Sequence, residues 1–317
     1  PINEKKLKIK LTSEKIEPYI NKSLYKYLIL VKDKINDYPS EWNYNKKYTN
    51  IYEFIHTSLS INNNCVSQLK PISRAFYKLI EIINTSELLN KYKYKNIKTF
   101  HLAEGPGGFI EAMSYLRNNE NDIYYGTTLI DFDNKNIPSW KKSNIVSDSN
   151  IIIENGCDDT GNLYNENNFL YFNEKYFDQF DFVTADGGID FSADFDKQEI
   201  MATKLIFCEI FYALCLLKKG GMFVLKMFDI FHKSSIECIY LLSIMFEEVN
   251  ILGNTIQNTP YGKIVDKIEN ELNNNNSLIG SNVLANDIIS KTRRTISTII
   301  IIEHILKKIK INSMKFT

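Results

Sequence analysis

The sequence predicts an α/β fold, built on a mainly parallel seven-stranded sheet with helices on both faces. Three observations lead to this prediction. Short apolar runs of strand length alternate with longer segments of helical periodicity, and turns rich in glycine or polar residues separate them. The alternation continues from residue 97 to residue 252. Parallel strands need such helical crossovers, which cover both faces of their sheet.

The individual elements follow from the same patterns. Apolar or β-branched runs predict strands at 97–103, 122–129, 151–154, 180–185, 222–227, 248–252 and 299–302. Helical spacing predicts helices near 20–35, 73–82, 109–116, 198–217 and 235–245. Pro71 and Ser73 precede the second helix, so Ser73 is its predicted N-cap.

Two domain-level expectations follow. We expect residues 1–69 to form a mostly helical N-terminal extension and residues 70–312 to form the α/β domain. Residues 253–290 are polar and rich in asparagine, which predicts an insertion before the last strand.

Composition limits the classes of function. The chain has 38 basic and 38 acidic residues, so no global field draws it to nucleic acid, and any basic groove is local. Five cysteines show no C-x-x-C pair, which argues against a zinc site or a disulfide framework and favours a reducing, intracellular compartment. We expect no membrane segment, because no apolar run reaches 18 residues. Heavy use of Asn, Lys and Ile is typical of an AT-rich genome, and a viral source fits this composition.

A glycine-rich turn follows the first strand of the α/β domain. Its glycines stand at 105, 107 and 108, which does not match the Gly-x-Gly-x-x-Gly spacing of dinucleotide folds. Glu104 places a carboxylate where a pyrophosphate would bind, and this disfavours a nicotinamide dehydrogenase. A cationic, amino-acid-bearing ligand suits the turn better, and S-adenosylmethionine (SAM) has both properties. The alternative is a turn that is tight for structural reasons alone.

Polar side chains stand at the ends of four predicted strands. They are Glu104, Asp158, Asp186 and Lys226. Ligands of parallel sheets bind beyond the carboxyl ends of the strands, so this pattern predicts a site there. Two simpler interpretations stay open: an Asx turn at Asp158 and a strand-ending turn at Asp186.

Six segments in order carry a family resemblance: 73–79, 103–109, 126–129, 158–161, 185–188 and 220–231. Together they resemble the FtsJ-like ribose 2'-O-methyltransferases, and most closely their cap-specific mRNA branch. The resemblance covers roughly residues 70–252 and 291–302. It implies a Rossmann-like, class I SAM-dependent methyltransferase fold with SAM as the cofactor and no metal.

The resemblance also implies catalytic roles. Lys226 would be the base, Lys78 its neighbour and the partner of the substrate hydroxyl, and Asp186 the residue that orients Lys226. A fourth family residue, a glutamate, should fall near Ser297 or Thr298, where the sequence has none.

Binding residues follow in the same way. The predicted cofactor-binding residues are Glu104, Gly105, Pro106, Gly107, Gly108, Phe109, Thr128, Leu129, Asp158, Asp159 and Asp186. The predicted RNA-binding residues are Arg74, Lys197, Arg293 and Arg294, because their cations could contact phosphates.

The expected function is 2'-O-methylation of the first transcribed nucleotide of capped mRNA, with RNA as partner and no membrane. Two alternatives remain: a ribose methyltransferase for ribosomal or transfer RNA, and a non-catalytic RNA-binding or assembly subunit. A protein partner in a capping or transcription complex would fit the first reading.

Overall fold

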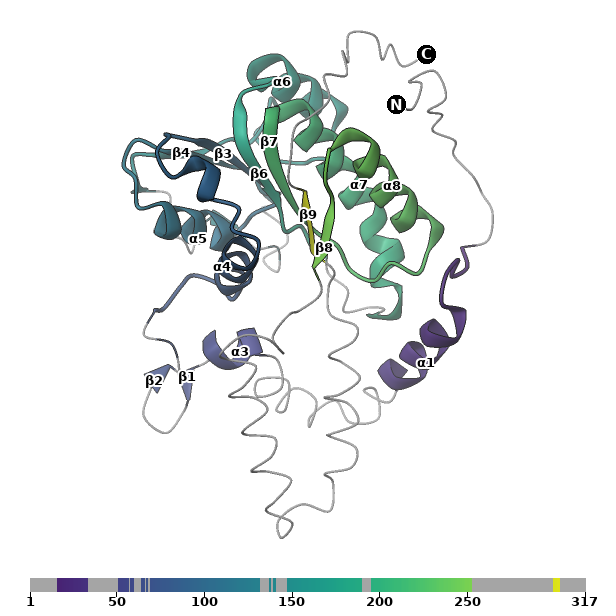
Figure 1. The fold of residues 1–317 in the computed structure, drawn as a ribbon. Coiled ribbons are helices and arrows are strands. Elements are labelled where there is room, and N and C mark those ends of the chain that lie inside the picture. The colour runs from purple at the N-terminus through teal and green to yellow at the C-terminus, as the bar shows by residue number, and fades with distance from the viewer. Residues whose placement is uncertain are drawn as a thin grey trace.

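The structure is a computed structural model, which describes residues 16–33, 51–56, 58–59, 64–65, 67, 69–131, 137, 139–140, 147–189, 195–252 and 299–302. Its centre is a seven-stranded sheet with strand order β5–β4–β3–β6–β7–β9–β8 (Figure 1). The strands are β3 (Lys98–Leu102), β4 (Ile123–Gly126), β5 (Ile151–Ile153), β6 (Phe180–Ala185), β7 (Leu217–Lys226), β8 (Asn250–Leu252) and β9 (Ile299–Ile302).

Five neighbouring strands, from β5 to β7, pair in parallel. Strand β9 then pairs antiparallel with both β7 and β8. Parallel pairing aligns the carboxyl ends of β3 and β6, since Leu102 lies opposite Ala185. Ala185 in turn lies opposite Leu225 of β7. The residues that follow these strands therefore meet at one edge of the sheet.

Helices cover both faces of the sheet, as the sequence predicts (Figure 1). One face carries α4 (Ala75–Thr85) and α5 (Gly108–Arg117), and the other carries α6 (Glu166–Tyr176), α7 (Gln198–Leu216) and α8 (Lys233–Met245). Alternating strand residues supply the two cores. Phe182 packs with the α4 and α5 side, and its neighbour Val183 packs with the α6, α7 and α8 side.

Short elements precede the sheet: α1 (Lys22–Asp33), α3 (Ile51–His56) and the two-stranded pairing of β1 (Ser58–Leu59) with β2 (Asn64–Cys65). Single-turn 3₁₀ helices lie at Asn90–Tyr92 and Phe195–Lys197. The expected insertion at 253–290 lies outside the described residues.

Three local predictions were wrong or incomplete. Ser73 is not the cap of α4: the N-cap is Arg74, and it makes no side-chain cap hydrogen bond. Helix α6 was missed, although the Asn165 side chain caps it by accepting from the Asn167 N–H. Strand β7 begins at Leu217, earlier than predicted, because the chain passes directly from α7 into the strand with an irregularity in its pairing to β6.

Candidate active site

Three residues that are far apart in the sequence meet at the carboxyl edge of the sheet. Lys78 comes from α4, Asp186 directly follows β6, and Lys226 ends β7. The Lys226 Nζ lies 3.1 Å from Asp186 Oδ1 and donates a hydrogen bond to the Asp186 backbone carbonyl at 3.0 Å. The Lys78 Nζ lies 3.9 Å from the same Oδ1. Both predicted catalytic amines therefore face one carboxylate oxygen.

These three charges are largely withdrawn from solvent. Burial raises the pKa of the Asp186 carboxyl, but the ammonium groups of Lys226 and Lys78 lower it more, so the net pKa lies below the ordinary value. Burial lowers the pKa of the Lys78 amine; Asp186 opposes this shift, and the charges of Lys226 and Arg74 add to it. Lys78 thus loses its proton more readily than an exposed lysine.

Glu104 folds back onto the start of α5. Its Oε1 accepts hydrogen bonds from the backbone N–H groups of Phe109 at 2.5 Å and Ile110 at 3.2 Å. Burial raises the pKa of the Glu104 carboxyl well above its ordinary value, and the Asp186 charge contributes to this increase. The two N–H groups only partly offset it. A cation placed beside Glu104 would therefore relieve an unfavourable buried charge.

The glycines of the turn serve backbone geometry and packing. Gly107 adopts a left-handed conformation with φ of 115°, which glycine allows without steric strain. A Cβ on Gly108 would overlap the Ser73 hydroxyl at the start of α4. The close approach at Gly108 is thus to α4, and the approach of this glycine to a ligand stays a prediction.

Phe109, another predicted cofactor-binding residue, already has protein partners for its side chain and its N–H. Its side chain is fully buried in the core, and its backbone N–H is used by Glu104. Gly105 and Pro106, joined by a cis peptide bond, are the partly exposed residues of the turn. They are the part of the turn that a ligand can reach.

Two further turns adjoin the glycine-rich one. Glu104 N–H donates to the carbonyl of Thr127, and Ile130 N–H donates to the carbonyl of Thr160 at 2.7 Å. A Cβ on Gly161 would overlap the carbonyl of Thr128. The structure thus brings the predicted cofactor residues after β3, β4 and β5 together; among them, Thr128 is buried and Leu129 is exposed.

Asp158 and Asp159 differ in what they can offer a ligand. The Asp158 carboxylate accepts hydrogen bonds from Thr160 in its own loop and from Asn165 and Asn168 at the start of α6. The contact with Thr160 is the Asx turn that the sequence left open as the simpler interpretation of Asp158. These hydrogen bonds lower the Asp158 pKa. Asp159 is exposed, and no described residue hydrogen-bonds its carboxylate. Asp159 is therefore the acid of this pair that can face a ligand.

Two buried polar atoms in these turns lack partners. Within the described ranges, neither Thr127 Oγ1 nor Asn155 Oδ1 has a hydrogen bond. Both belong to the loops after β4 and β5, beside Gly161, whose N–H donates to the Asn155 carbonyl. Unpaired buried polar atoms destabilise a protein unless a ligand or water satisfies them. The turns therefore fit a ligand with hydrogen-bonding groups.

Of the predicted RNA-binding residues, Arg74 lies next to the catalytic group. It directly precedes α4, forms an ion pair with Glu53 of α3, and lowers the pKa of both Asp186 and Lys78 through its charge. Lys197 is exposed at the start of α7. Arg293, Arg294, Ser297 and Thr298 lie outside the described residues.

The sequence analysis missed one buried acid at this edge. Glu209 of α7 is 1% exposed, and its Oε1 accepts a hydrogen bond from the Gly187 N–H at 3.1 Å. Burial raises the pKa of Glu209 to about 8. The signal for it was present: a single glutamate interrupts the apolar run from Leu205 to Leu217.

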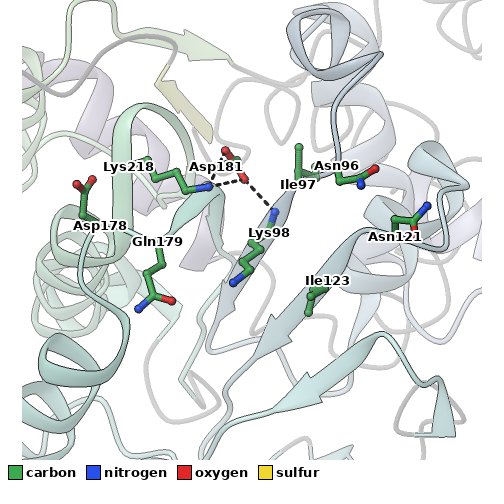
Figure 2. Close-up of a pocket in the computed structure, with 9 residues that line it drawn as sticks. All are labelled: Asn96, Ile97, Lys98, Asn121, Ile123, Asp178, Gln179, Asp181 and Lys218. Atoms are coloured by element: carbon green, nitrogen blue, oxygen red, sulfur yellow. Dashed lines mark hydrogen bonds and ion pairs between the residues drawn. The ribbon is translucent and has the colours of Figure 1, made fainter.

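A pocket of about 330 Å³ lies at the other end of the sheet (Figure 2). It is lined by the residues around the amino ends of β3, β4 and β6. Asp181 accepts hydrogen bonds there from the Lys98 backbone and the Lys218 ammonium group. In this pocket, the Asp181 carboxylate and the Lys218 ammonium group already neutralise each other. The pocket also lies away from Lys78 and Lys226, so we do not assign the active site to it.

The described part of the chain has neither a metal-binding cluster nor a helix that could span a membrane. It holds no group of three or more His, Cys, Asp or Glu side chains arranged to bind a metal ion. None of its helices combines the length and the apolar character needed to cross a bilayer.

Known proteins resemble this chain over most of its length. The cap-specific mRNA (nucleoside-2'-O-)-methyltransferase 2 of Drosophila melanogaster is 30% identical over 246 residues, which cover 72% of this chain and 33% of that protein. The protein of the same name from Danio rerio is 29% identical, over 70% of this chain and 31% of its own length. The chain thus spans about a third of the length of these relatives.

A solved structure of a Plasmodium falciparum ribosomal RNA methyltransferase aligns at 15% identity and a TM-score of 0.43, over 74% of this chain and 98% of that one. The sequence model of the FtsJ-like methyltransferases matches residues 71–258, more than half of the chain. The chain therefore belongs to the FtsJ-like methyltransferase family.

Proposed function

We propose that the protein is a SAM-dependent ribose 2'-O-methyltransferase that acts on the first transcribed nucleotide of capped mRNA. The single observation that carries this proposal is the shared oxygen of Asp186, which Lys78 and Lys226 both face at the carboxyl edge of the sheet. The names of the Drosophila and zebrafish relatives support the cap-specific reading. The family match over residues 71–258 supports a start of the methyltransferase domain near residue 70, and we propose the range 70–312 for this domain and an N-terminal extension over 1–69.

The turns at this edge fit SAM. Glu104 is a buried carboxyl group whose ionised form gains from a nearby cation, and the cofactor carries an ammonium and a sulfonium group. Thr127, Asn155 and exposed Asp159 offer partners for its polar edges. When bound, the cofactor supplies an electrophilic methyl group.

The protein has two tasks, which are alignment of the ribose hydroxyl and removal of its proton. We assign the base to Lys226, the role that the family resemblance implies; the carboxylate and the backbone carbonyl of Asp186 position its amine. Lys78 lies farther from Asp186 and has a lowered pKa, so its amine can contact the hydroxyl without a fixed charge. Asp186 keeps both amines on the same side of the site.

Arg74 and Lys197 are the proposed phosphate contacts among the described residues. Arg74 lies close enough to Asp186 and Lys78 to change the pKa of both, so a phosphate bound to it would lie next to the reacting ribose. Phosphate contacts position RNA and carry no sequence information. Cap recognition would then have to come from other residues.

One experiment separates the proposal from its two alternatives. Labelled SAM is incubated with the protein and two RNAs of one sequence, one with a methylguanosine cap and one with a 5'-triphosphate. We expect label on the ribose of the first nucleotide of the capped RNA only. Equal transfer to the uncapped RNA would contradict the cap-specific reading, and RNA binding without transfer would favour the non-catalytic subunit.

The Lys226→Ala variant ties transfer to the site. We expect it to lower kcat by about a hundred- to ten-thousandfold, which is the usual contribution of a general base. Lys218→Ala is the matched control, because Lys218 lies in the same strand and pairs with Asp181 at the opposite end of the sheet. Wild-type activity in Lys226→Ala would remove the base assignment.

A further inference from the structure

We propose that Glu209 is a positioning residue of this site, which holds the Asp186–Gly187 peptide group from the side opposite Lys226. The proposal rests on the proposed function, because it concerns how the same Lys226 is held. It assigns a role to a buried carboxyl group that neither the family motifs nor the mechanism uses.

The argument starts from one peptide group. The carbonyl of Asp186 and the N–H of Gly187 belong to the same planar unit. The carbonyl accepts a hydrogen bond from Lys226 Nζ at 3.0 Å, and the N–H donates to Glu209 Oε1 at 3.1 Å. A continuous chain of hydrogen bonds therefore runs from the Lys226 amine through this peptide to Glu209. In a buried site, such bonds polarise and strengthen one another.

Gly187 and Glu209 are also matched in shape. A Cβ on Gly187 would overlap Glu209 Oε1 and would lie 2.8 Å from Leu205 Cδ2. Glycine at 187 thus lets the carboxyl group reach the peptide N–H. Since Asp186 is the adjacent residue, the contact fixes the backbone that presents its carboxylate to both lysines.

The charges around Glu209 link it to the base. It interacts electrostatically with Lys226 of β7 and Asp186 after β6, and with Tyr164 before α6 and Cys208 of its own helix. Burial raises the pKa of Glu209, the Lys226 charge lowers it, and the result is about 8. Glu209 is consequently mostly protonated at neutral pH.

The test uses Glu209→Leu, which removes the acceptor for the Gly187 N–H, and Glu209→Gln, which keeps an oxygen acceptor there. We expect Glu209→Leu to lower kcat about tenfold with KM for SAM little changed, and Glu209→Gln to keep most of the wild-type kcat at neutral pH, where the wild-type carboxyl group is mostly protonated. Glu237→Gln is the control, because Glu237 is exposed on α8 and, among the described residues, its ion pair is with Lys233. Wild-type kcat in Glu209→Leu, or an equal loss in Glu209→Leu and Glu209→Gln, would overturn the proposal.

A second readout needs no activity. A buried acid with a raised pKa makes the folded state less stable as pH rises from about 5 to about 8, because the unfolded chain has released that proton. The Tm of Glu209→Gln relative to wild type should therefore rise over this range. A constant difference would show that the pKa of Glu209 is not raised in the folded protein. If wild type transfers no methyl group, the proposed function fails, and this measurement still decides the state of Glu209.

Should Glu209→Leu fail to fold, Gly187→Ala tests the same contact. The added methyl group displaces the Glu209 carboxyl group from the peptide N–H. We expect a lower kcat in a folded protein, and an unchanged kcat would contradict the role of this contact.

Discussion

Lys78 and Lys226 share a carboxylate oxygen but are held differently. Lys226 makes two contacts with Asp186, and its ammonium group also lies 4.9 Å from the centre of the Phe228 ring. Lys78 makes one longer contact and is the amine whose pKa burial lowers. This asymmetry suits two different tasks, a fixed base and an adaptable hydroxyl partner. The difference arises because Lys226 lies at the end of the central strand β7, whereas Lys78 lies on α4, a helix that packs on the sheet.

Glu104 makes cofactor binding dependent on pH. Its raised pKa means that the protein without ligand holds a proton there above the ordinary titration range of glutamate. A cationic ligand favours the ionised form, so binding should release that proton, and affinity should rise with pH until the raised pKa is passed. Titration calorimetry of S-adenosylhomocysteine in buffers of different ionisation enthalpy measures this release.

The matched variant is Glu104→Gln, which keeps an acceptor for the Phe109 and Ile110 N–H groups. Its binding should release no proton at this site and should vary little with pH. Equal proton release by wild type and variant would show that another group titrates.

Among the elements, α1 contacts the loop that follows Lys226. The Tyr25 ring lies edge-on to Phe231 and His232 at 5.3 Å, and Lys32 pairs with Asp229 at 3.3 Å. Pro18 bridges to His232, which itself donates its backbone N–H to Glu199 of α7. The N-terminal segment with α1 and the start of α7 thus hold this loop between β7 and α8.

Tyr25→Ala tests the contribution of α1. Each aromatic pair contributes about 0.5–1.5 kcal/mol beyond burial, so we expect a loss of about 2 kcal/mol in the free energy of unfolding, measured in urea. Leu24→Ala on the same helix is the control, because Leu24 is largely exposed and should change the free energy by less than about 0.5 kcal/mol. Equal effects of the two substitutions would mean that α1 is not docked through Tyr25.

The elements also show how far the sequence predicts the structure. Strand β6 and the last strand, β9, match their predicted ranges, because β-branched and aromatic runs bounded by turn residues are unambiguous. Helix α6 was missed because its sequence is polar and rich in asparagine, which is typical of a loop. Ser73 does not cap α4, because its hydroxyl group packs against Gly108 of α5.

For the whole molecule, parallel topology is the feature that assembles the site. It places the ends of β3, β6 and β7 side by side, which is why the convergence of Asp186 and Lys226 could be predicted from strand order alone. The contact of Glu209 with Gly187 could not be predicted, because an acidic residue within an apolar helix gives no sign of which residue it will face. The expected contribution of Arg293 and Arg294 stays a prediction.

The central claim is that the methyl donor binds at the carboxyl edge of the sheet, facing Lys78, Asp186 and Lys226. A crystal structure of the protein with SAM bound tests it most directly. We expect the methionine part against Gly105 and Pro106, with the sulfonium methyl group directed at the two lysines. Cofactor in the pocket of Figure 2, at the opposite end of the sheet, or a methyl group directed away from Lys226, would contradict the account.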